Sequence, residues 1–276
     1  GLDPDQIDLV IYSGEEVKEY RNWPVGPKIQ KELGLKNAWS FDIQQRCGTT
    51  LVALKMARDM IRADEGLKNI LIVSSYRNSD LIHYPNPRVR WMYYLAAGGA
   101  ACVVQRDCPK NEIINGHFLS DGSFAFDVYV PQGGSAEPMT VEGLEEGKQY
   151  LDVLDPVGMK ERLERLSLSN WLLCIDKALD KCGFTRNDVD YLATLLVKRS
   201  AHDYLMKEMG LGPEQTRYLA EFGHHGQNDQ ILSLELAVEE NRLKDGDLVL
   251  MISAGIGYAW NVVVMRWGKM RFTVDS

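Results

Sequence analysis

The sequence predicts an α/β fold in which helices cover parallel or mixed β-sheets. Short runs of β-branched and other apolar residues alternate with amphipathic segments along the chain. Parallel strands need long crossover connections, usually helices, so this alternation favours sheets with helices on their faces. With 276 residues, 45% of them hydrophobic, the chain can bury one large core or two closely packed halves.

Eight segments are predicted to be strands because β-branched, aromatic and other apolar residues dominate them. They form two groups, and each group also contains a predicted helix. The predicted strands are residues 7–12, 38–43, 69–75, 100–105 and 113–119, followed by 191–197, 248–253 and 258–267.

Two long helices are predicted, over residues 47–63 and 158–181. One side of the first helix is apolar, so this helix is expected to be buried on most of its circumference. Its apolar stripe consists of Leu51, Leu54, Ala57 and Ile61. The Gly, Pro and Ser-rich residues 130–140 predict a long loop between two halves, residues 1–140 and 141–276.

Charge and composition exclude several classes of protein. The net charge of −8 and a pI near 5.2 argue against a nucleic-acid partner, which would need a concentrated basic face. No apolar run approaches the length of a membrane span, and the first residues do not resemble a secretory signal. The five cysteines form no CxxC pair, which predicts reduced thiols in a cytoplasmic protein.

Cys47 is the candidate nucleophile. It follows a predicted strand and a short polar turn, and it opens the buried helix predicted over residues 47–63. A thiol at a helix N-terminus lies near unpaired N–H groups and the positive end of the helix dipole. We therefore expect the pKa of Cys47 to be lowered, with Arg46 adding positive charge. The alternative is that Cys47 only fills core volume.

Two glycine-containing stretches supply further candidates. In "EFGHHGQND", residues 221–229, adjacent histidines point in different directions, so at most one is expected to share a pocket with Asp229. In "SAGIGYAW", Gly255 and Gly257 allow the backbone to approach a ligand closely or to adopt a positive φ. A hairpin without a functional role is the alternative for this second stretch.

Several of these motifs occur together, and in the same order, in a known superfamily. They are "AWSFDIQQRCGTTLVALKMA", "KNILIVSSYRNSD", "LAAGGAACVV" and "FGHHGQNDQILSLELAVEENRLKDGDLVLMISAGIGYAW". Over nearly its whole length the chain resembles the thiolase superfamily, and within it the β-ketoacyl-acyl-carrier-protein synthase III-like enzymes. The resemblance implies a five-layered αβαβα fold of two similar halves, a homodimer, and activity on acyl thioesters of coenzyme A or of a carrier protein.

Two departures from the family pattern refine the expected site. "VKRSAHD" has Lys198 where the family usually has a catalytic histidine, and Gly223 is followed by His224 instead of the usual asparagine. Residues 223–229 match the G-H-x-G-x-x-D pattern of a subset that includes polyketide-starter ketosynthases and acyltransferase-like members. The resemblance thus implies that Cys47 is the nucleophile, His224 the base and Asp229 its orienting partner.

The implied chemistry is acyl transfer through a cysteine acyl-enzyme in lipid or polyketide biosynthesis. The backbone N–H groups of Cys47 and Gly257 are expected to bind the oxyanion, and Lys198 and Gly255 are candidate substrate contacts. Coenzyme A enters as a thioester substrate, and no tightly bound cofactor is expected. The alternatives are decarboxylative condensation, which normally uses the two replaced residues, and a non-catalytic partner subunit.

Two further hypotheses concern metal binding and the start of the chain. A metal site would use His224, His225 and Asp229, with His202 as an optional further ligand, but no HxxxH or CxxC spacing supports it. The alternative to a substrate contact at Lys198 is a solvated side chain.

Relative to the family, a first strand, a helix and a basic segment are expected to precede "GLDPDQIDLVIYSG". We therefore expect a longer functional protein, or one that assembles with the missing piece.

Overall fold

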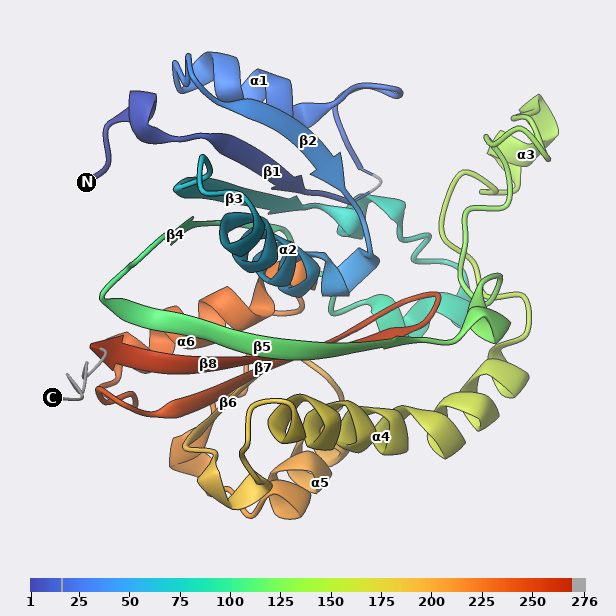
Figure 1. Ribbon diagram of the computed structural model, residues 1–276. Coiled ribbons are helices and arrows are strands. Elements are labelled where there is room, and N and C mark those ends of the chain that lie inside the picture. The colour runs from blue at the N-terminus through green and yellow to red at the C-terminus, as the bar shows by residue number, and fades with distance from the viewer. Residues whose placement is uncertain (16, 270–276) are drawn as a thin grey trace, which may run out of the picture.

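A computed structural model describes residues 1–15 and 17–269, which form two four-stranded sheets with helices on both sides of each (Figure 1). The strand orders are β2-β1-β3-β4 and β5-β8-β7-β6. The strands are β1 (Leu9–Ser13), β2 (Trp39–Ile43), β3 (Asn69–Tyr76), β4 (Gly98–Gln105), β5 (Lys110–Ser120), β6 (Tyr191–Thr194), β7 (Leu248–Gly255) and β8 (Ala259–Lys269). The α-helices are α1 (Val25–Glu32), α2 (Thr49–Ala63), α3 (Val141–Glu145), α4 (Pro156–Asp180), α5 (Arg199–Met209) and α6 (Asp229–Glu239).

In the first sheet, β1 pairs in parallel with both β2 and β3, and β4 runs antiparallel to β3. Every residue of β1 is buried, as expected for a parallel strand that is covered on both faces. Helix α1 covers the outer face, where Ile29 and Leu35 pack against Val10. Helix α2 covers the inner face, with Leu51 and Leu54 among its buried residues.

In the second sheet, β8 lies between β5 and β7 and is antiparallel to both, whereas β6 is parallel to β7. Helix α4 packs on the outer face, where Trp171 and Ile175 join the same buried cluster as Trp260 of β8. Helix α5 lies on that side too, through Leu205 and Met209. The outer face of this sheet is therefore closed by two helices (Figure 1).

Helices α2 and α6 form the layer between the two sheets. The buried cluster there joins Leu54 of α2 and Leu234 of α6 to apolar side chains from both sheets, among them Ile72 and Met251. Helix α1, the first sheet, this central layer, the second sheet and helices α4 and α5 make five layers, so the predicted αβαβα fold is confirmed (Figure 1).

All eight predicted strands are present, with ends displaced by at most a few residues. Two helix starts differ from prediction. Helix α4 begins at Pro156, because the Asp155 side chain accepts a hydrogen bond from Gly158 N (2.9 Å) and proline suits the first helical position. Helix α2 begins at Thr49, because residues 46–48 form a separate 3-10 turn, η2 (Arg46–Gly48).

The two sheets divide the chain at a different point from the predicted halves. Residues 130–140 form the expected loop without regular structure. However, β5 precedes this loop and pairs with β8, so the chain passes from one sheet to the other between Gln105 and Lys110. The division into domains 1–140 and 141–276 stays a prediction.

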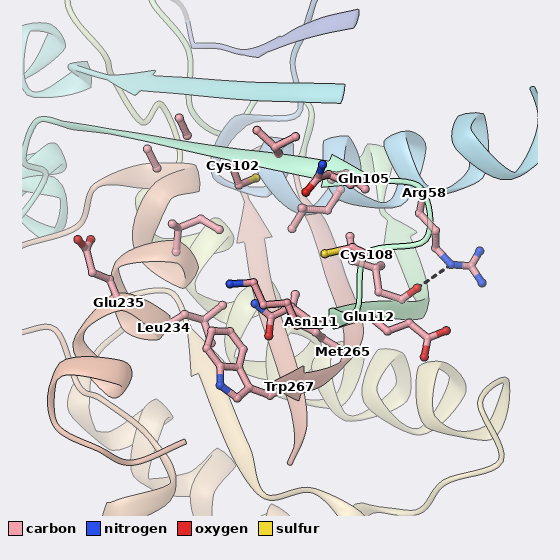
Figure 2. Close-up of a pocket in the computed structure, with 18 of the residues that line it drawn as sticks. Arg58, Cys102, Gln105, Cys108, Asn111, Glu112, Leu234, Glu235, Met265 and Trp267 are labelled. Atoms are coloured by element: carbon pink, nitrogen blue, oxygen red, sulfur yellow. Dashed lines mark hydrogen bonds between the residues drawn. The ribbon is translucent and has the colours of Figure 1, made fainter. Parts of the chain in front are cut away.

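A cavity of about 1060 Å³ lies alongside β4, which among the described strands pairs only with β3 (Figure 2). The side chains around it include Cys102, Cys108, Leu234, Met265 and Trp267. Arg58 lies at this cavity, and its Nε donates to the carbonyl oxygen of Ile113 (2.9 Å).

The expectation of a longer functional protein stays a prediction. In the described part of the chain, no helix combines the length and apolar character needed to cross a bilayer.

Candidate active site

Cys47 lies in η2, the tight turn that connects the carboxyl end of β2 to α2, and its residue surface is 6% exposed. The turn has an uncommon backbone conformation, because Arg46 has a φ of 51° without being glycine. Thr49 stabilises it from within: its Oγ1 accepts from Gln45 N (2.7 Å) and donates to Arg46 O (2.6 Å). The thiol is therefore held on a defined turn next to the core.

His224 is positioned by a short segment of the first half. Its N–H donates to Tyr94 O, and its carbonyl accepts from Ala96 N, both at 2.9 Å. The two flanking glycines are needed, since both have positive φ. A Cβ at Gly223 would lie 2.8 Å from Tyr94 O, and one at Gly226 would lie 2.2 Å from the Tyr76 ring. This explains the G-H-x-G spacing in physical terms.

The structure brings the three predicted residues together. The Nε2 atom of His224 lies 3.2 Å from Sγ of Cys47, and its Nδ1 lies 2.6 Å from Oδ2 of Asp229. Asp229 is fully buried and also accepts from Leu196 N and His225 N, both at 2.7 Å. Because a carboxylate only accepts, Nδ1 carries the imidazole proton and Nε2 is free to accept the thiol proton.

The pKa of Cys47 differs from the sequence prediction. Burial raises the pKa of the thiol above its usual value, although the adjacent His224 acts to lower it. The expected lowering at a helix N-terminus was wrong, because the sulfur is desolvated and precedes the helix proper. Burial acts to lower the pKa of His224, but Asp229 and Cys47 more than offset it and raise this pKa well above its usual value.

These two shifts describe a weakly acidic thiol beside a strongly basic imidazole. The two groups are in contact, so their titrations are coupled and belong to both residues together. General-base activation uses the state in which Nε2 of His224 is unprotonated, and His224 then removes the thiol proton during attack.

Two tyrosines that the sequence analysis missed flank His224. The ring centroids of Tyr76 and Tyr94 lie 5.9 and 5.8 Å from that of the imidazole. Burial raises the pKa of both phenols, so both stay neutral at ordinary pH. The position of Tyr76 at the end of β3 was an available signal, because parallel strands ending at one edge bring their following residues together.

Glu15 was also missed by the sequence analysis. It is buried just after β1, accepts from Asn78 Nδ2 (3.2 Å) and lies 3.6 Å from Nη1 of Arg46. This carboxylate contributes to raising the pKa of Cys47. Arg46 thus forms an ion pair with Glu15 beside the turn.

The remaining predicted site residues lie in four different places in the fold. Gly255 is the last residue of β7 and lies in close contact with the nucleophile turn, since a Cβ at this position would lie 2.6 Å from Gln45 O. Gly257 lies between β7 and β8 with a φ of 122°. Lys198 is exposed and occupies the N-cap position of α5, with no capping hydrogen bond from its side chain. His225 lines the cavity beside β4, and its ring packs against Gly98.

The large cavity and the predicted chemistry lie in different places. Neither Cys47 nor His224 lines the cavity beside β4, whereas the neighbouring His225 does. The contacts among Cys47, His224 and Asp229 are the stronger evidence for an active site, because they join reactive groups at hydrogen-bond distance. In residues 1–15 and 17–269, no three His, Cys, Asp or Glu side chains are grouped to hold a metal ion.

Two family models match this chain. The model for 3-oxoacyl-[acyl-carrier-protein (ACP)] synthase III matches residues 41–122, and that for the C-terminal part of the same enzyme matches residues 179–267. Together they cover more than half of the chain and contain Cys47, His224 and Asp229. The chain belongs to the 3-oxoacyl-[acyl-carrier-protein] synthase III family.

Individual relatives agree with this membership in the synthase III family. A β-ketoacyl-[acyl-carrier-protein] synthase III of Chlamydia caviae is 25% identical over 96% of this chain and 77% of its own length. The crystal structure of 3-oxoacyl-[acyl-carrier-protein] synthase III from Aquifex aeolicus has a TM-score of 0.80 at 20% identity, covering 96% of this chain and 79% of that one.

The priming β-ketosynthase of the R1128 polyketide biosynthetic pathway also has this fold. Its structure matches with a TM-score of 0.80 at 22% identity, over 97% of this chain and 77% of that one. These two structural matches establish the thiolase-like fold, and the named relatives are transferase-type enzymes.

Proposed function

We propose that this protein is an acyltransferase that carries an acyl group on Cys47. The donor is a thioester of coenzyme A or of an acyl carrier protein, and the reaction belongs to lipid or polyketide biosynthesis. The observation that supports this most strongly is the contact chain from Cys47 Sγ to His224 (3.2 Å) and on to Asp229 (2.6 Å). It joins a nucleophile, a base and an orienting carboxylate in the order that covalent catalysis requires.

In the first half-reaction, Nε2 of His224 accepts the thiol proton while Sγ of Cys47 attacks the thioester carbonyl. Asp229 holds Nδ1–H and stabilises the imidazolium that forms. The backbone N–H groups of Cys47 and Gly257 are the proposed donors to the oxyanion. Collapse of the intermediate breaks the original C–S bond, and the departing thiolate takes the proton back from His224.

In the second half-reaction, His224 is the general base toward the acceptor. It removes a proton from an acceptor thiol, alcohol or amine as that group attacks the acyl-enzyme, and Sγ leaves and regains the proton. The scheme needs one positioned base and no resident cofactor. Coenzyme A enters and leaves as substrate and product.

Acyl transfer is better supported than decarboxylative condensation. Lys198, which stands where the family usually has a catalytic histidine, is exposed at the start of α5. The position of the usual asparagine is taken by His224, which already contacts both Cys47 and Asp229. The groups that normally stabilise an enolate are therefore both replaced. A substrate contact at Lys198 or Gly255 and a homodimeric assembly stay predictions.

The test is intact-protein mass spectrometry with a panel of acyl-coenzyme A thioesters. The native protein is expected to gain the mass of one acyl group, and Cys47→Ala is expected to gain none. The acyl-enzyme is then mixed with an acyl carrier protein, an alcohol, an amine or a malonyl thioester. Loss of the acyl mass without CO₂ release supports transfer, whereas loss with CO₂ release would support condensation. If no donor acylates the native protein, a non-catalytic subunit becomes the better explanation.

A further inference from the structure

Asn261 is fully buried near the start of β8, where it lies opposite Phe118 of β5 and Ser253 of β7. Its side chain reaches the nucleophile turn, which belongs to the other half of the fold. The Nδ2 atom donates to Oε1 of Gln45 (2.7 Å) and to the carbonyl oxygen of Gly48 (3.3 Å). The two bonded residues lie on either side of the pair Arg46 and Cys47 in the sequence.

The orientation of this amide follows from its partners. The Gly48 carbonyl can only accept, so the NH₂ group of Asn261 must face the turn. The Oδ1 atom is then buried, with no hydrogen-bond partner in the described part of the chain. A buried carbonyl without a partner costs free energy that an apolar side chain at this position would avoid. The presence of asparagine here therefore needs an explanation, and its two donated bonds to the turn offer one.

The turn needs external support because its own backbone is not in a common conformation. Arg46 has a φ of 51°, and the bonds of Thr49 hold only the start of the turn. The contact with Asn261 is also close, since a Cβ at Gly48 would lie 2.2 Å from its Nδ2. Asn261 thus bonds to two atoms of the turn, Gln45 Oε1 and Gly48 O, that Thr49 does not bond.

We propose that Asn261 is a positioning residue for Cys47, acting on the site of the proposed function. By bonding to Gln45 and Gly48 it fixes the turn, and so fixes the distance from Sγ to His224. It does not touch the acyl group and transfers no proton. Losing these bonds lets the sulfur move away from Nε2, which slows proton removal and acylation.

The main variant is Asn261→Leu, which has a similar shape without the donors. Ser253→Ala is the matched control, because Ser253 is equally buried, lies opposite Asn261 and has an Oγ without a partner in the described residues. We expect Asn261→Leu to lower the acylation rate about tenfold or more and to shift Cys47 alkylation by iodoacetamide to higher pH. Ser253→Ala should leave both unchanged. Unchanged acylation and alkylation in Asn261→Leu would overturn the proposal.

A second variant guards against a folding defect. Gln45→Leu removes the same hydrogen bond from a half-buried position and should shift the alkylation profile in the same direction. The double variant should acylate and alkylate as Asn261→Leu alone does, because Asn261→Leu has already removed the hydrogen bond that Gln45→Leu removes. Additive effects would contradict the proposal. Alkylation needs no acyl donor, so this test stands even if the native protein accepts no thioester and the proposed function fails.

Discussion

The Nε2 atom of His224 lies 3.2 Å from Sγ of Cys47, although 177 positions separate the two residues in the chain. Cys47 follows β2 of the first sheet, and Asp229, which orients His224, starts α6 on the inner face of the second. One buried side chain bonds across this junction, and a second holds α6 to β7. Gln227 donates from its amide to Ser13 O and Ser75 O, and Gln230 donates to Ile252 O. The site therefore depends on the packing of the two halves against each other.

Replacing His224 by alanine should shift alkylation of Cys47 to higher pH. The thiol pKa is already raised by burial, and His224 is the neighbour that acts to lower it. Without the imidazole less thiolate forms at a given pH, and the acylation rate should fall by roughly 10²- to 10⁴-fold. The measurement is the rate of iodoacetamide labelling from pH 6 to 10, together with acyl-enzyme formation.

The adjacent histidine provides the control for this variant. His225→Ala removes a ring that packs against Gly98, while the backbone N–H that donates to Asp229 stays. It should label and acylate like the native protein. Equal effects of the two histidine variants would remove His224 from the proposed mechanism.

Asp229→Asn should keep the shape of the site but reduce the rate by roughly 10³-fold or more, because an amide can present its NH₂ to Nδ1 and favour the wrong tautomer. The loss of the carboxylate also lowers the pKa of His224, which Asp229 helps to raise. Acylation and transfer rates across pH measure both effects. Asp203→Asn, at an exposed aspartate beside His202, is the control and should leave the rates unchanged. A fully active Asp229→Asn protein would contradict this role.

The free energy of unfolding is expected to fall as the pH rises above the ordinary histidine value of about 6.5. The pKa values of His224 and Cys47 are both raised in the folded state. Between the unfolded and folded pKa values, the folded protein therefore holds protons that the unfolded chain has released. Each such group stabilises the fold below its unfolded pKa, and this contribution is lost as pH rises through its folded pKa.

Urea denaturation at pH values from 6 to 9.5 tests this dependence on pH. His224→Gln should flatten the decline, because its side chain does not titrate, and His225→Ala should retain it. A decline of the same steepness in His224→Gln would show that other groups cause it.

Gly255→Ala should disturb the nucleophile turn from the β7 side. The added Cβ would lie 2.6 Å from Gln45 O and 3.3 Å from Cβ of Arg46, so the turn or the strand must shift. We expect a destabilisation of about 1–3 kcal/mol and a slower acylation. Thermal or urea unfolding and the acylation rate measure these two effects.

Gly134→Ala is the matched change for this experiment, because no atom lies within 4 Å of a Cβ placed there. It should leave both stability and acylation close to those of the native protein. A Gly255→Ala protein as active as Gly134→Ala would mean that the turn tolerates displacement.

Much of this fold was predictable from local sequence. The runs that became β1, β3 and β7 are apolar enough to specify buried strands, and the stripe from Leu51 to Ile61 specifies a helix with a buried face. The partner of β5 was not predictable in this way, because strand pairing depends on residues far apart in the chain. Nothing within residues 110–120 indicates that they pair with β8.

The sequence by itself determined the strands and the two long helices, because periodicity is a local property, and its resemblance to a known family implied the three proposed reacting groups. Only the tertiary structure decided the raised pKa of Cys47, the tyrosine rings beside His224 and the amide of Asn261 behind the turn. Each of these depends on desolvation or on contact between the two halves. Such effects arise when distant segments pack together, so no single stretch of sequence carries them.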